Sequence, residues 1–311
     1  MIEKAGLTRK TSFIVNPNAA NKKWLRRKKL RNYLQKKLPG QIHGDLGERE
    51  NTIELAKKLS LDHEMIVVIG GDGTISDVLQ GIFETQREKE VFLGIIPFGS
   101  GNAFRKSLDI PKKVRKAVSL LSEGEPREID LIEIEGRVAG FLSIGATAKV
   151  TQKKIQGNIQ GILGHLLAGR MLLTLSKKEQ EIELMDGIDD HGHHFARKKM
   201  MLQFFDCVVA KTNYFGYNWK IAPKAKADDS YLDITFFETS GPKYVLFLPL
   251  IYFGLFQKTQ KHFKAKKIII QGSGLPVQYN GEFLGVREKI EVKILPKAIK
   301  IICPKKAFKK S

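Results

Sequence analysis

The stretch MIVVIGGDGTISDVLQGIF, residues 65–83, decides the fold. Its first five residues, Met65–Ile69, form a continuous apolar run of the length expected for a strand buried on both faces of a parallel sheet. The apolar residues further along recur at i, i+3, i+4, i+7 and i+8, which is the spacing of an amphipathic helix. They are Ile75, Val78, Leu79, Ile82 and Phe83.

The loop between this strand and this helix, GGDGT at 70–74, has the composition of a phosphate-binding turn. Glycine allows positive φ and a close approach of the backbone to a ligand, because no Cβ stands in the way. The helix offers first-turn N–H groups without intrahelical acceptors, and the positive end of its dipole, to an anion. A carboxylate in the loop suits a Mg²⁺ ion that bridges phosphates. A tight turn alone is the alternative, but the combination favours phosphate binding.

A second loop of the same kind follows the next apolar strand, Val91–Ile96. It reads PFGSGN at 97–102, where two glycines flank a hydroxyl group and an amide follows. Alone this pattern is weak, but loops at the carboxyl ends of parallel strands lie where α/β proteins bind ligands. Together the two loops predict a nucleotide site. Neither GxxxxGK[ST] nor GxGxxG occurs, which argues against a P-loop or a Rossmann site.

The two parts of the chain differ in pattern. Up to about residue 125, short apolar strands alternate with helical patterns, which predicts an α/β domain with a largely parallel sheet. After Pro126, strand-like segments separated by turn residues predict an antiparallel β domain. We therefore expect an α/β nucleotide-binding domain over 1–128 and an all-β domain over 129–303, with the tail 304–311 returning to the first domain.

The charge of the chain restricts its partners. It has 311 residues, with 53 Lys and Arg against 33 Asp and Glu, a formal net charge of +20. Such a charge attracts nucleic acid or an anionic membrane surface, or only keeps the surface solvated. No nucleic-acid-reading motif occurs, so we expect no nucleic-acid partner. The two cysteines, Cys207 and Cys303, exclude a disulfide framework and are typical of a reducing cytosol. Neither a secretory signal nor a membrane span is expected.

Two apolar stretches interrupt the second domain, Ile162–Leu175 and Val245–Phe256. The second is rich in aromatic residues and is followed by a basic run from Lys258 to Lys267. Apolar side chains beside basic ones are typical of a surface that docks on anionic lipid, whereas a buried helix flanked by solvated lysines is the alternative. We expect a cytoplasmic protein in peripheral contact with a membrane, and self-association stays open.

Short motifs run through the whole sequence in order. Asn16-Pro17, GGDGT at 70–74 and PFGSGN at 97–102 resemble the diacylglycerol kinase catalytic domain family, which includes bacterial lipid kinases and sphingosine and ceramide kinases. The resemblance implies an α/β nucleotide-binding domain of the NAD kinase and diacylglycerol kinase type, followed by an antiparallel β-sandwich-like domain, with ATP and lipid meeting between them. It continues in SIGATA at 143–148, NYFG at 213–216, IAPKA at 221–225, DDSYLD at 228–233 and NGE at 280–282.

Position by position, the resemblance implies a site for ATP and Mg²⁺. Asp72 would be central to binding of magnesium–ATP, and its neighbours would hold the phosphates. Ser100 stands where threonine is commoner, and Asp45 lies where many relatives have a threonine. The implied nucleotide contacts are Asn16, Pro17, Asn18, Ala19, Ala20, Asp45, Gly70, Gly71, Asp72, Gly73, Thr74, Asp77, Gly99, Ser100, Gly101 and Asn102.

The resemblance also implies roles in the second domain. A structural Mg²⁺ would be held by the carboxylate of Asp229 and the backbone oxygens of Lys226 and Tyr231. Glu282 matches the glutamate proposed to deprotonate the lipid hydroxyl. Glu282 and Asp72 are therefore the implied catalytic residues.

Three departures from the family pattern concern the substrate and the charge of the site. Asn280 replaces the aspartate of DGE, Thr147 stands where many bacterial members have an aspartate, and Lys149 replaces an aspartate that reads the head group in sphingosine kinases. Asn280-Gly281 is also a strong hairpin signal, because both central positions of a type I′ turn have positive φ. Since Asp-Gly forms the same turn, we expect Asn280→Asp to leave stability nearly unchanged.

The sequence therefore predicts an ATP-dependent lipid kinase that transfers the γ-phosphoryl group to a hydroxyl of diacylglycerol or a related lipid. Such a transfer depends mainly on positioning and on charge stabilisation. A nucleotide- or lipid-binding regulator with a weak or inactive catalytic centre is the alternative outside enzymes. NAD kinase, which shares GGDGT, is less favoured, because no Asn-Glu-like loop that reads adenosine and nicotinamide is found in register.

Overall fold

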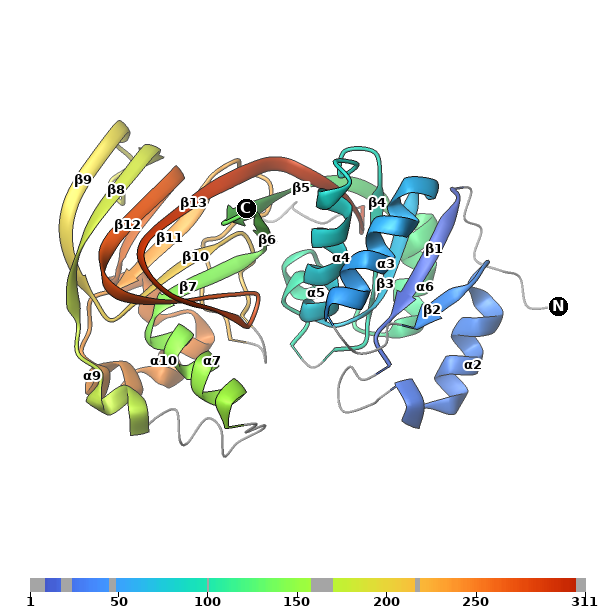
Figure 1. Ribbon diagram of the computed structural model, residues 1–311, viewed down its shortest axis with the longest axis horizontal. Helices are drawn as coiled ribbons and strands as arrows, with labels where there is room; N and C mark the ends of the chain where they lie inside the picture. Colours follow the sequence, from blue (N-terminus) through green and yellow to red (C-terminus); the bar gives the residue numbers. More distant parts are fainter. Residues whose placement is uncertain are drawn as a thin grey trace. The chain divides into compact units, whose positions relative to one another are not determined.

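The computed structural model describes residues 9–17, 24–44, 49–99, 101–157, 170–215 and 219–305, except the side chains of residues 257 and 258. The chain forms two compact units, whose elements are labelled in Figure 1. Unit 1 contains residues 1–131 and 297–311, and unit 2 contains residues 132–296. The domain boundaries expected at residues 128 and 303 stay a prediction. Most of the tail expected to return to the first domain, residues 306–311, lies outside the described residues.

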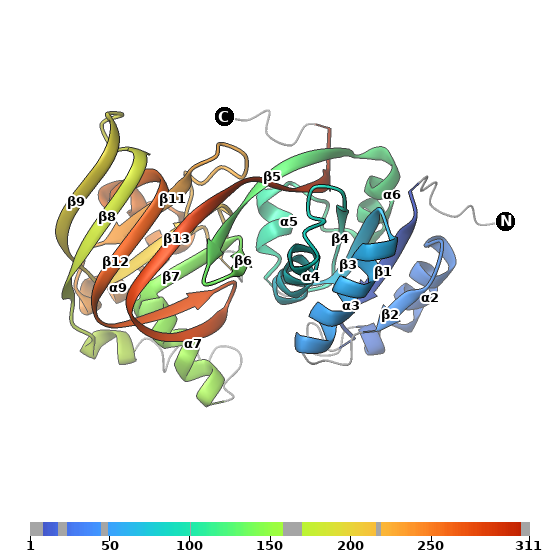
Figure 2. The same ribbon diagram turned by 45° about the horizontal axis from the view of Figure 1, so that its top comes forward.

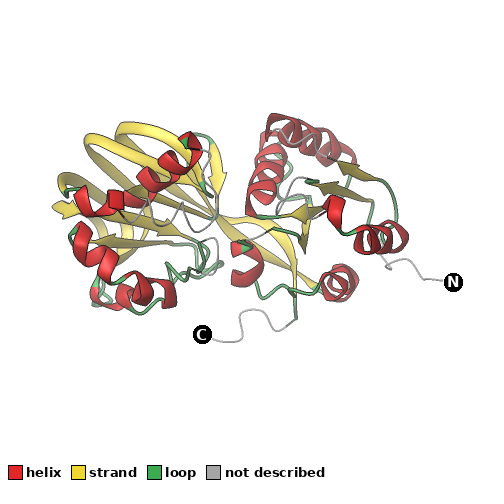
Figure 3. Cartoon of the chain, turned by 90° about the horizontal axis from the view of Figure 1, so that it is seen from below, coloured by secondary structure: helices red, strands yellow, loops and turns green. Residues whose placement is uncertain are grey.

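Unit 1 is built on a parallel sheet. Its elements are β1 (Thr11–Val15), β2 (Ile42–Gly44), β3 (Met65–Gly70), β4 (Phe92–Pro97), α2 (Lys28–Lys37), α3 (Arg49–Asp62), α4 (Asp72–Glu84), α5 (Ala103–Ser107) and α6 (Val114–Glu123). β1 pairs with β2 and β3, and β3 pairs with β4, all in parallel. Every residue of β3 is buried, as its continuous apolar run predicts. Helices cover both sides of these strands (Figure 3), which confirms the α/β class.

Unit 2 consists mainly of antiparallel strands. Its strands are β6 (Arg137–Ala139), β7 (Phe141–Gly145), β8 (Lys178–Ile188), β9 (His194–Phe204), β10 (Asp206–Ala210), β11 (Leu232–Phe237) and β12 (Lys261–Tyr279). β11, β10, β7 and β12 are neighbours in that order, and the β8–β9 hairpin joins them through β12. Figure 2 shows β9, β8 and β12 side by side. Buried aliphatic and aromatic side chains from these strands form one core, as expected for a β-sandwich-like domain.

The chain passes between the units within strands. These are β5 (Glu125–Ile134) and β13 (Glu282–Cys303). The last part of β13 pairs in parallel with β4, where Lys300 lies opposite Phe92. The sequence predicts only a short strand at Ile290–Leu295 in this region. The strand is longer because backbone pairing continues through exposed charged positions such as Lys289, which pairs with Gln271 of β12 and interrupts the apolar pattern.

The β8–β9 hairpin is the main element that the sequence pattern does not predict. Its strands carry charged side chains that pair across the hairpin, as in the Arg197 Nε–Glu183 Oε1 ion pair at 2.5 Å. Apolar residues such as Ile182 and Leu184 alternate with these charged residues and pack into the core. The many charged residues on the solvated face make this alternation hard to recognise in the sequence. The apolar pattern of Leu202–Val209 predicts a single strand, but these residues form the end of β9 and most of β10.

The apolar stretch Val245–Phe256 contributes to short helices. Unit 2 contains α7 (Ala146–Gln156), α9 (Gly241–Leu246), α10 (Leu248–Phe253) and a 3₁₀ turn at Phe256–Thr259. Ile251 is buried, but Leu246 and Phe253 are 72% and 65% exposed, so the stretch is not a buried core helix. Most of Ile162–Leu175 lies outside the described residues. Within the described ranges, no helix is both long enough and apolar enough to cross a membrane.

Asn280-Gly281 forms the expected hairpin turn between β12 and β13, with φ of 46° and 92°. Asn280 is also buried, and its side chain is tied to the chain between β6 and β7. Its Oδ1 accepts hydrogen bonds from the N–H groups of Gly140 (3.0 Å) and Phe141 (3.4 Å), while Nδ2 donates to the Val138 carbonyl (3.4 Å). An aspartate would keep the acceptor and lose the donor. The expectation that Asn280→Asp leaves stability unchanged is therefore revised.

We expect Asn280→Asp to lower the free energy of unfolding by about 1–3 kcal/mol at pH 7, because it leaves a buried carboxylate facing a carbonyl oxygen. At acidic pH the protonated carboxyl can donate again, so the deficit relative to the parent should shrink. Denaturant unfolding at both pH values measures the effect. Gln271→Glu makes the same chemical change at an exposed position of β12 and should show no deficit. Parental stability of Asn280→Asp at pH 7 would contradict this account.

Candidate active site

The loops predicted to bind the nucleotide leave one edge of the unit 1 sheet. β1, β3 and β4 run in the same direction, with Val15 opposite Ile69 and Gly70 opposite Pro97. The backbone N–H of Asn16 donates to the carbonyl of Ile69 at 3.3 Å, which holds the first loop against the second strand. The segments after the three strands therefore begin at neighbouring points, as the parallel topology requires.

The two glycine-rich loops touch through their backbones. A Cβ on Gly71 would lie 2.9 Å from Cα of Gly99, and a Cβ on Gly99 would lie 2.4 Å from Cα of Gly71. Only glycine permits an approach this close at both positions. By contrast, a Cβ on Gly73, in the first turn of α4, would meet nothing within 4 Å. The loops thus leave open space beside the N-terminus of α4, where an anion is favoured.

Asp72 connects the two loops through its side chain. Its Oδ1 accepts a hydrogen bond from the backbone N–H of Phe104 at 3.2 Å, so the carboxylate caps the first turn of α5. Burial raises the pKa of Asp72, and the N–H groups of Ala103 and Phe104 and the ammonium of Lys106 oppose that rise. The motif alone does not reveal this contact, because the partner is 32 residues away in the chain. Asp72 is therefore fixed beside both glycine-rich loops.

Other predicted nucleotide residues have mainly structural contacts. Asp77 forms an ion pair with Arg49 Nε at 2.7 Å, which links α4 to α3. Thr74 is buried. Asn102 adopts a left-handed conformation, and its Nδ2 donates to the carbonyl of Gly99 at 2.7 Å, which shapes the second loop. Five predicted contacts lie outside the described residues: Asn18, Ala19, Ala20, Asp45 and Ser100.

Lys106 is a cation near the loops that sequence analysis does not single out. Its Nζ donates to the carbonyl of Gly101 at 2.7 Å. Burial lowers the pKa of Lys106, Arg105 lowers it further and Asp72 opposes the change. The available signal is spacing, since Lys106 lies four residues after Asn102 and hence one helical turn into α5. An ammonium at this point can neutralise phosphate charge.

Glu282, the predicted base, is the first residue of β13 and is exposed. Its carboxylate has no hydrogen-bond or ion-pair partner within the part of the chain that the structure describes. The turn before it is held by the buried Gln278, whose Oε1 accepts from the N–H of Gly281 at 3.0 Å and whose Nε2 donates to Ser143 Oγ at 2.9 Å. Glu282 is thus a solvated carboxylate on a rigid turn.

A carboxylate does lie beside Thr147, although the sequence lacks the aspartate expected there. Asp206 of β10 pairs with Gly145 of β7, and it accepts hydrogen bonds from the N–H of Thr147 at 3.2 Å and from its hydroxyl. Burial raises the pKa of Asp206 to about 7, and the hydrogen bonds from Thr147 oppose this shift. Because Asp206 is fully buried, we assign it to holding the end of β7.

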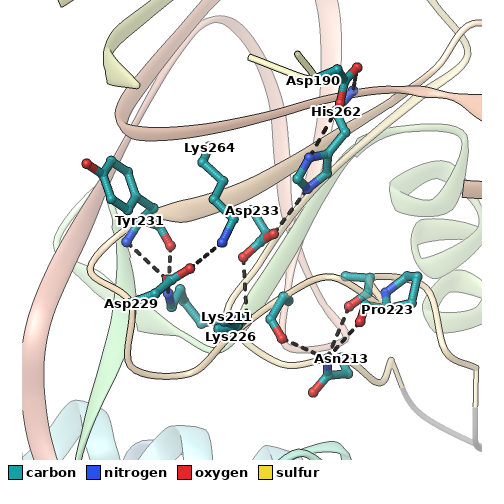
Figure 4. A network of polar contacts seen from close by, with 12 residues as sticks. Asp190, Lys211, Asn213, Pro223, Lys226, Asp229, Tyr231, Asp233, His262 and Lys264 are labelled. Carbon is teal, nitrogen blue, oxygen red and sulfur yellow. Dashed lines mark hydrogen bonds and ion pairs between the residues drawn. The ribbon is translucent and has the colours of Figure 1, made fainter. Parts of the chain in front are cut away.

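The predicted metal ligands of unit 2 lie among side-chain ammonium groups (Figure 4). Lys211 Nζ donates to Asp229 Oδ1 and to the backbone oxygen of Tyr231, both at 2.6 Å, and Lys264 Nζ donates to Asp229 Oδ2 at 2.5 Å. Burial opposes ionisation of Asp229, but the two ammonium groups outweigh it and hold its pKa below the usual value. No group of three or more His, Cys, Asp or Glu suited to a metal occurs in the described ranges. This arrangement does not fit a divalent cation.

A cavity of about 190 Å³ lies beside this network, lined by IAPKA residues and by three buried polar side chains, Asp233, Thr235 and His262. His262 Nε2 lies 3.1 Å from Asp233 Oδ1, and the backbone N–H of His262 donates to Asp190 Oδ2 at 2.8 Å. Figure 4 shows His262 between the two carboxylates. The IAPKA motif therefore forms part of the wall of a cavity within unit 2 that is lined mainly by apolar atoms.

Two family models match this chain. Residues 10–134 match the diacylglycerol kinase catalytic domain, and residues 167–303 match the YegS C-terminal NAD kinase beta sandwich-like domain. The diacylglycerol kinase of Staphylococcus carnosus is 26% identical over 272 residues, which cover 80% of this chain and 82% of that protein. The diacylglycerol kinase of Staphylococcus saprophyticus is 26% identical over 259 residues, covering 78% and 80% respectively.

A solved structure supports the same fold. The crystal structure of a diacylglycerol kinase from Bacillus anthracis has a TM-score of 0.70 at 21% identity, and the match covers 96% of this chain and 99% of that one. The two family models follow one another along the chain in the order of the α/β and β-sandwich-like parts. The chain therefore belongs to the diacylglycerol kinase catalytic domain family, whose members are lipid kinases that transfer a phosphoryl group to an alcohol.

Proposed function

We propose that this lipid kinase uses ATP to phosphorylate a hydroxyl of diacylglycerol or a closely related lipid. The observation that carries the proposal is the backbone contact between Gly71 and Gly99 at the carboxyl edge of the unit 1 sheet. Such an edge offers backbone N–H groups and a helix N-terminus to phosphates, with little side-chain volume in the way. The names of the staphylococcal relatives support the choice of acceptor, and Lys149 argues against a sphingoid base.

The residues around the two glycine-rich loops fit Mg²⁺–ATP. The backbone of Gly71–Thr74 would receive the phosphates, and Asp72 would offer a carboxylate oxygen to the metal that accompanies ATP. Bound there, Mg²⁺ supplies charge neutralisation at the phosphates. Lys106, which contacts the second loop, would neutralise further phosphate charge.

Glu282 is the base in this proposal. The lipid hydroxyl gives its proton to the Glu282 carboxylate, and its oxygen bonds to the γ-phosphorus. The bond between that phosphorus and the β–γ bridging oxygen breaks, and ADP leaves. An exposed carboxylate on a rigid turn suits this role, because burial does not disfavour its charge and no cation among the described residues pairs with it.

Glu282→Gln should lower the single-turnover rate of lipid phosphorylation at least about a hundredfold, since general-base contributions begin near that value. Affinity for ATP should be unchanged, because the proposal assigns ATP binding to the glycine-rich loops of unit 1, whereas Glu282 belongs to unit 2. Glu288→Gln makes the same change at an exposed position further along β13 and should keep the parental rate. If Glu282→Gln also turns over at the parental rate, the base lies elsewhere.

Gly73→Ala tests whether the open space beside α4 receives a ligand. In the free protein the added Cβ meets nothing within 4 Å, and alanine is favoured over glycine in a helix, so thermal stability should stay or rise slightly. A phosphate at the N-terminus of α4 would meet that Cβ, so ATP affinity should fall at least about tenfold, or 1.4 kcal/mol. Calorimetric titration with ATP measures this. Unchanged affinity would place the phosphates away from the first turn of α4.

Membrane docking is supported by exposed apolar side chains on and after two helices of unit 2. Leu246 of α9 and Phe253 of α10 are the most exposed, Leu255 is 51% exposed, and the exposed Lys243 accompanies them on α9. Apolar side chains beside a cation favour an anionic lipid surface. We call this set the α9–α10 surface.

The basic run that follows contributes less to docking than its sequence indicates. Lys261 pairs with Glu238 at 3.1 Å, and Lys267 pairs with Glu291 at 2.9 Å. Lys264 is bound to Asp229, as described above. These lysines lie along β12, and their charges are largely matched by carboxylates. The α9–α10 surface and the net charge of the whole chain therefore carry the docking proposal.

Replacing Leu246 and Phe253 by serine should lower binding to anionic vesicles at least about tenfold, because each apolar side chain contributes roughly 1.5–3 kcal/mol when fully buried. Sedimentation with vesicles of increasing anionic lipid content measures it, and added salt should weaken parental binding by screening. Leu61→Ser removes another exposed leucine, from α3 in unit 1, and should have no effect. If the double variant binds vesicles as tightly as the parent, the α9–α10 surface does not dock on the membrane.

The decisive assay for the function combines ATP, Mg²⁺ and diacylglycerol in mixed micelles. Formation of a phosphorylated lipid is the expected result. Nucleotide binding without any lipid product would instead support the regulator alternative.

A further inference from the structure

We infer that the side-chain ammonium of Lys211 takes the position that the family pattern assigns to a structural Mg²⁺. In unit 2 an ammonium group of the chain itself therefore replaces the metal ion. This inference concerns the stability of unit 2, and it holds or fails independently of the proposed kinase activity.

The geometry places one cation on two of the implied metal ligands. Lys211 Nζ contacts both Asp229 Oδ1 and the Tyr231 carbonyl at 2.6 Å, which are hydrogen-bond distances to an ammonium (Figure 4). A Mg²⁺ ion needs about 2.0–2.1 Å to each oxygen and an octahedral shell that usually includes water. With the ammonium between these two oxygens, that shell cannot form.

Lys211 is held firmly in this position. The side chain is 1% exposed, so the ammonium has no route to solvent without rearrangement. The residue directly follows β10, and its backbone N–H donates to the carbonyl of Gly140 at 2.7 Å. A buried ammonium is stable only with anionic or carbonyl partners, and here these are the oxygens that would otherwise bind the metal.

The charges of the cluster also exclude a further cation. Lys264 occupies the other carboxylate oxygen of Asp229, and the charge of Asp233 acts on Lys264. These two lysines and two aspartates sum to a formal charge of zero. A divalent cation would leave an excess of two positive charges in a largely buried volume, which is unfavourable unless an ammonium leaves.

The loop that carries Asp229 is fixed by further contacts that need no metal. Asn213 Nδ2 donates to the carbonyl of Ala225 at 2.7 Å, and the backbone N–H of Lys226 donates to Asp233 Oδ2 at 3.3 Å. Figure 4 shows both contacts beside the lysine network. The backbone of Lys226, one of the implied metal ligands, is thus held in place by Asp233.

The first test uses the full chain freed of metal with EDTA, without nucleotide or lipid. The melting temperature should be unchanged when millimolar MgCl₂ is added, and titration with Mn²⁺ followed by electron paramagnetic resonance should show no bound ion that depends on Asp229. A Mg²⁺-dependent rise in melting temperature that Asp229→Asn abolishes would overturn the inference, because it would mean that the metal displaces Lys211.

The second test removes the internal cation. Lys211→Met keeps an apolar stem but leaves Asp229 with one cation, so the melting temperature should fall by about 5–10 °C. Mg²⁺ or Mn²⁺ should then recover part of this loss, because the two oxygens become available. Lys267→Met, which breaks another ion pair of unit 2, should gain no response to metal.

If Lys211→Met folds and stays indifferent to both metals, Lys211 does not stand at a cation position and the inference fails. If it folds only in the presence of Mg²⁺, the inference is supported, and if it folds in neither condition, the parental comparison with Asp229→Asn decides.

Discussion

The close approach of two backbones at Gly71 and Gly99 is the constraint on which the nucleotide site depends. Any side chain at either position would separate the ends of β3 and β4, whose pairing extends to Gly70 and Pro97. The same contact brings Asp72 within reach of α5, so one carboxylate can cap a helix across two loops. The parallel sheet places the two loops side by side, and the two glycines leave enough space for their backbones to approach.

Much of this region follows from the sequence, because buried parallel strands appear as continuous apolar runs and their loops meet at one edge. β3, β4, α4 and both glycine-rich loops lie where these patterns predict. The turn at Asn280-Gly281 is predicted equally well, because positive φ at two successive positions is a local requirement. Local sequence is informative wherever backbone conformation alone decides the structure.

Contacts between residues far apart in the chain account for what sequence reasoning did not predict. The side chain of Asn280 is hydrogen-bonded to Gly140, and the carboxylate of Asp229 is bound by Lys211 and Lys264. No sequence motif identifies these three residues as partners. The β8–β9 hairpin was missed for a related reason, since cross-strand ion pairs replace the apolar alternation on its exposed face. Such pairings become visible only when the register of the strands is known.

The path of β13 has a consequence for synthesis of the chain. One edge of β4 remains without a neighbouring strand until Lys300 and Ile301 pair with Phe92 and Leu93. At ribosomal rates of roughly 5–20 residues per second, the roughly 200 residues between β4 and this partner take about 10–40 s to emerge. During that interval an apolar strand edge stands open to other nascent chains. The sheet of the N-terminal unit is therefore completed only after the last strand has been synthesised.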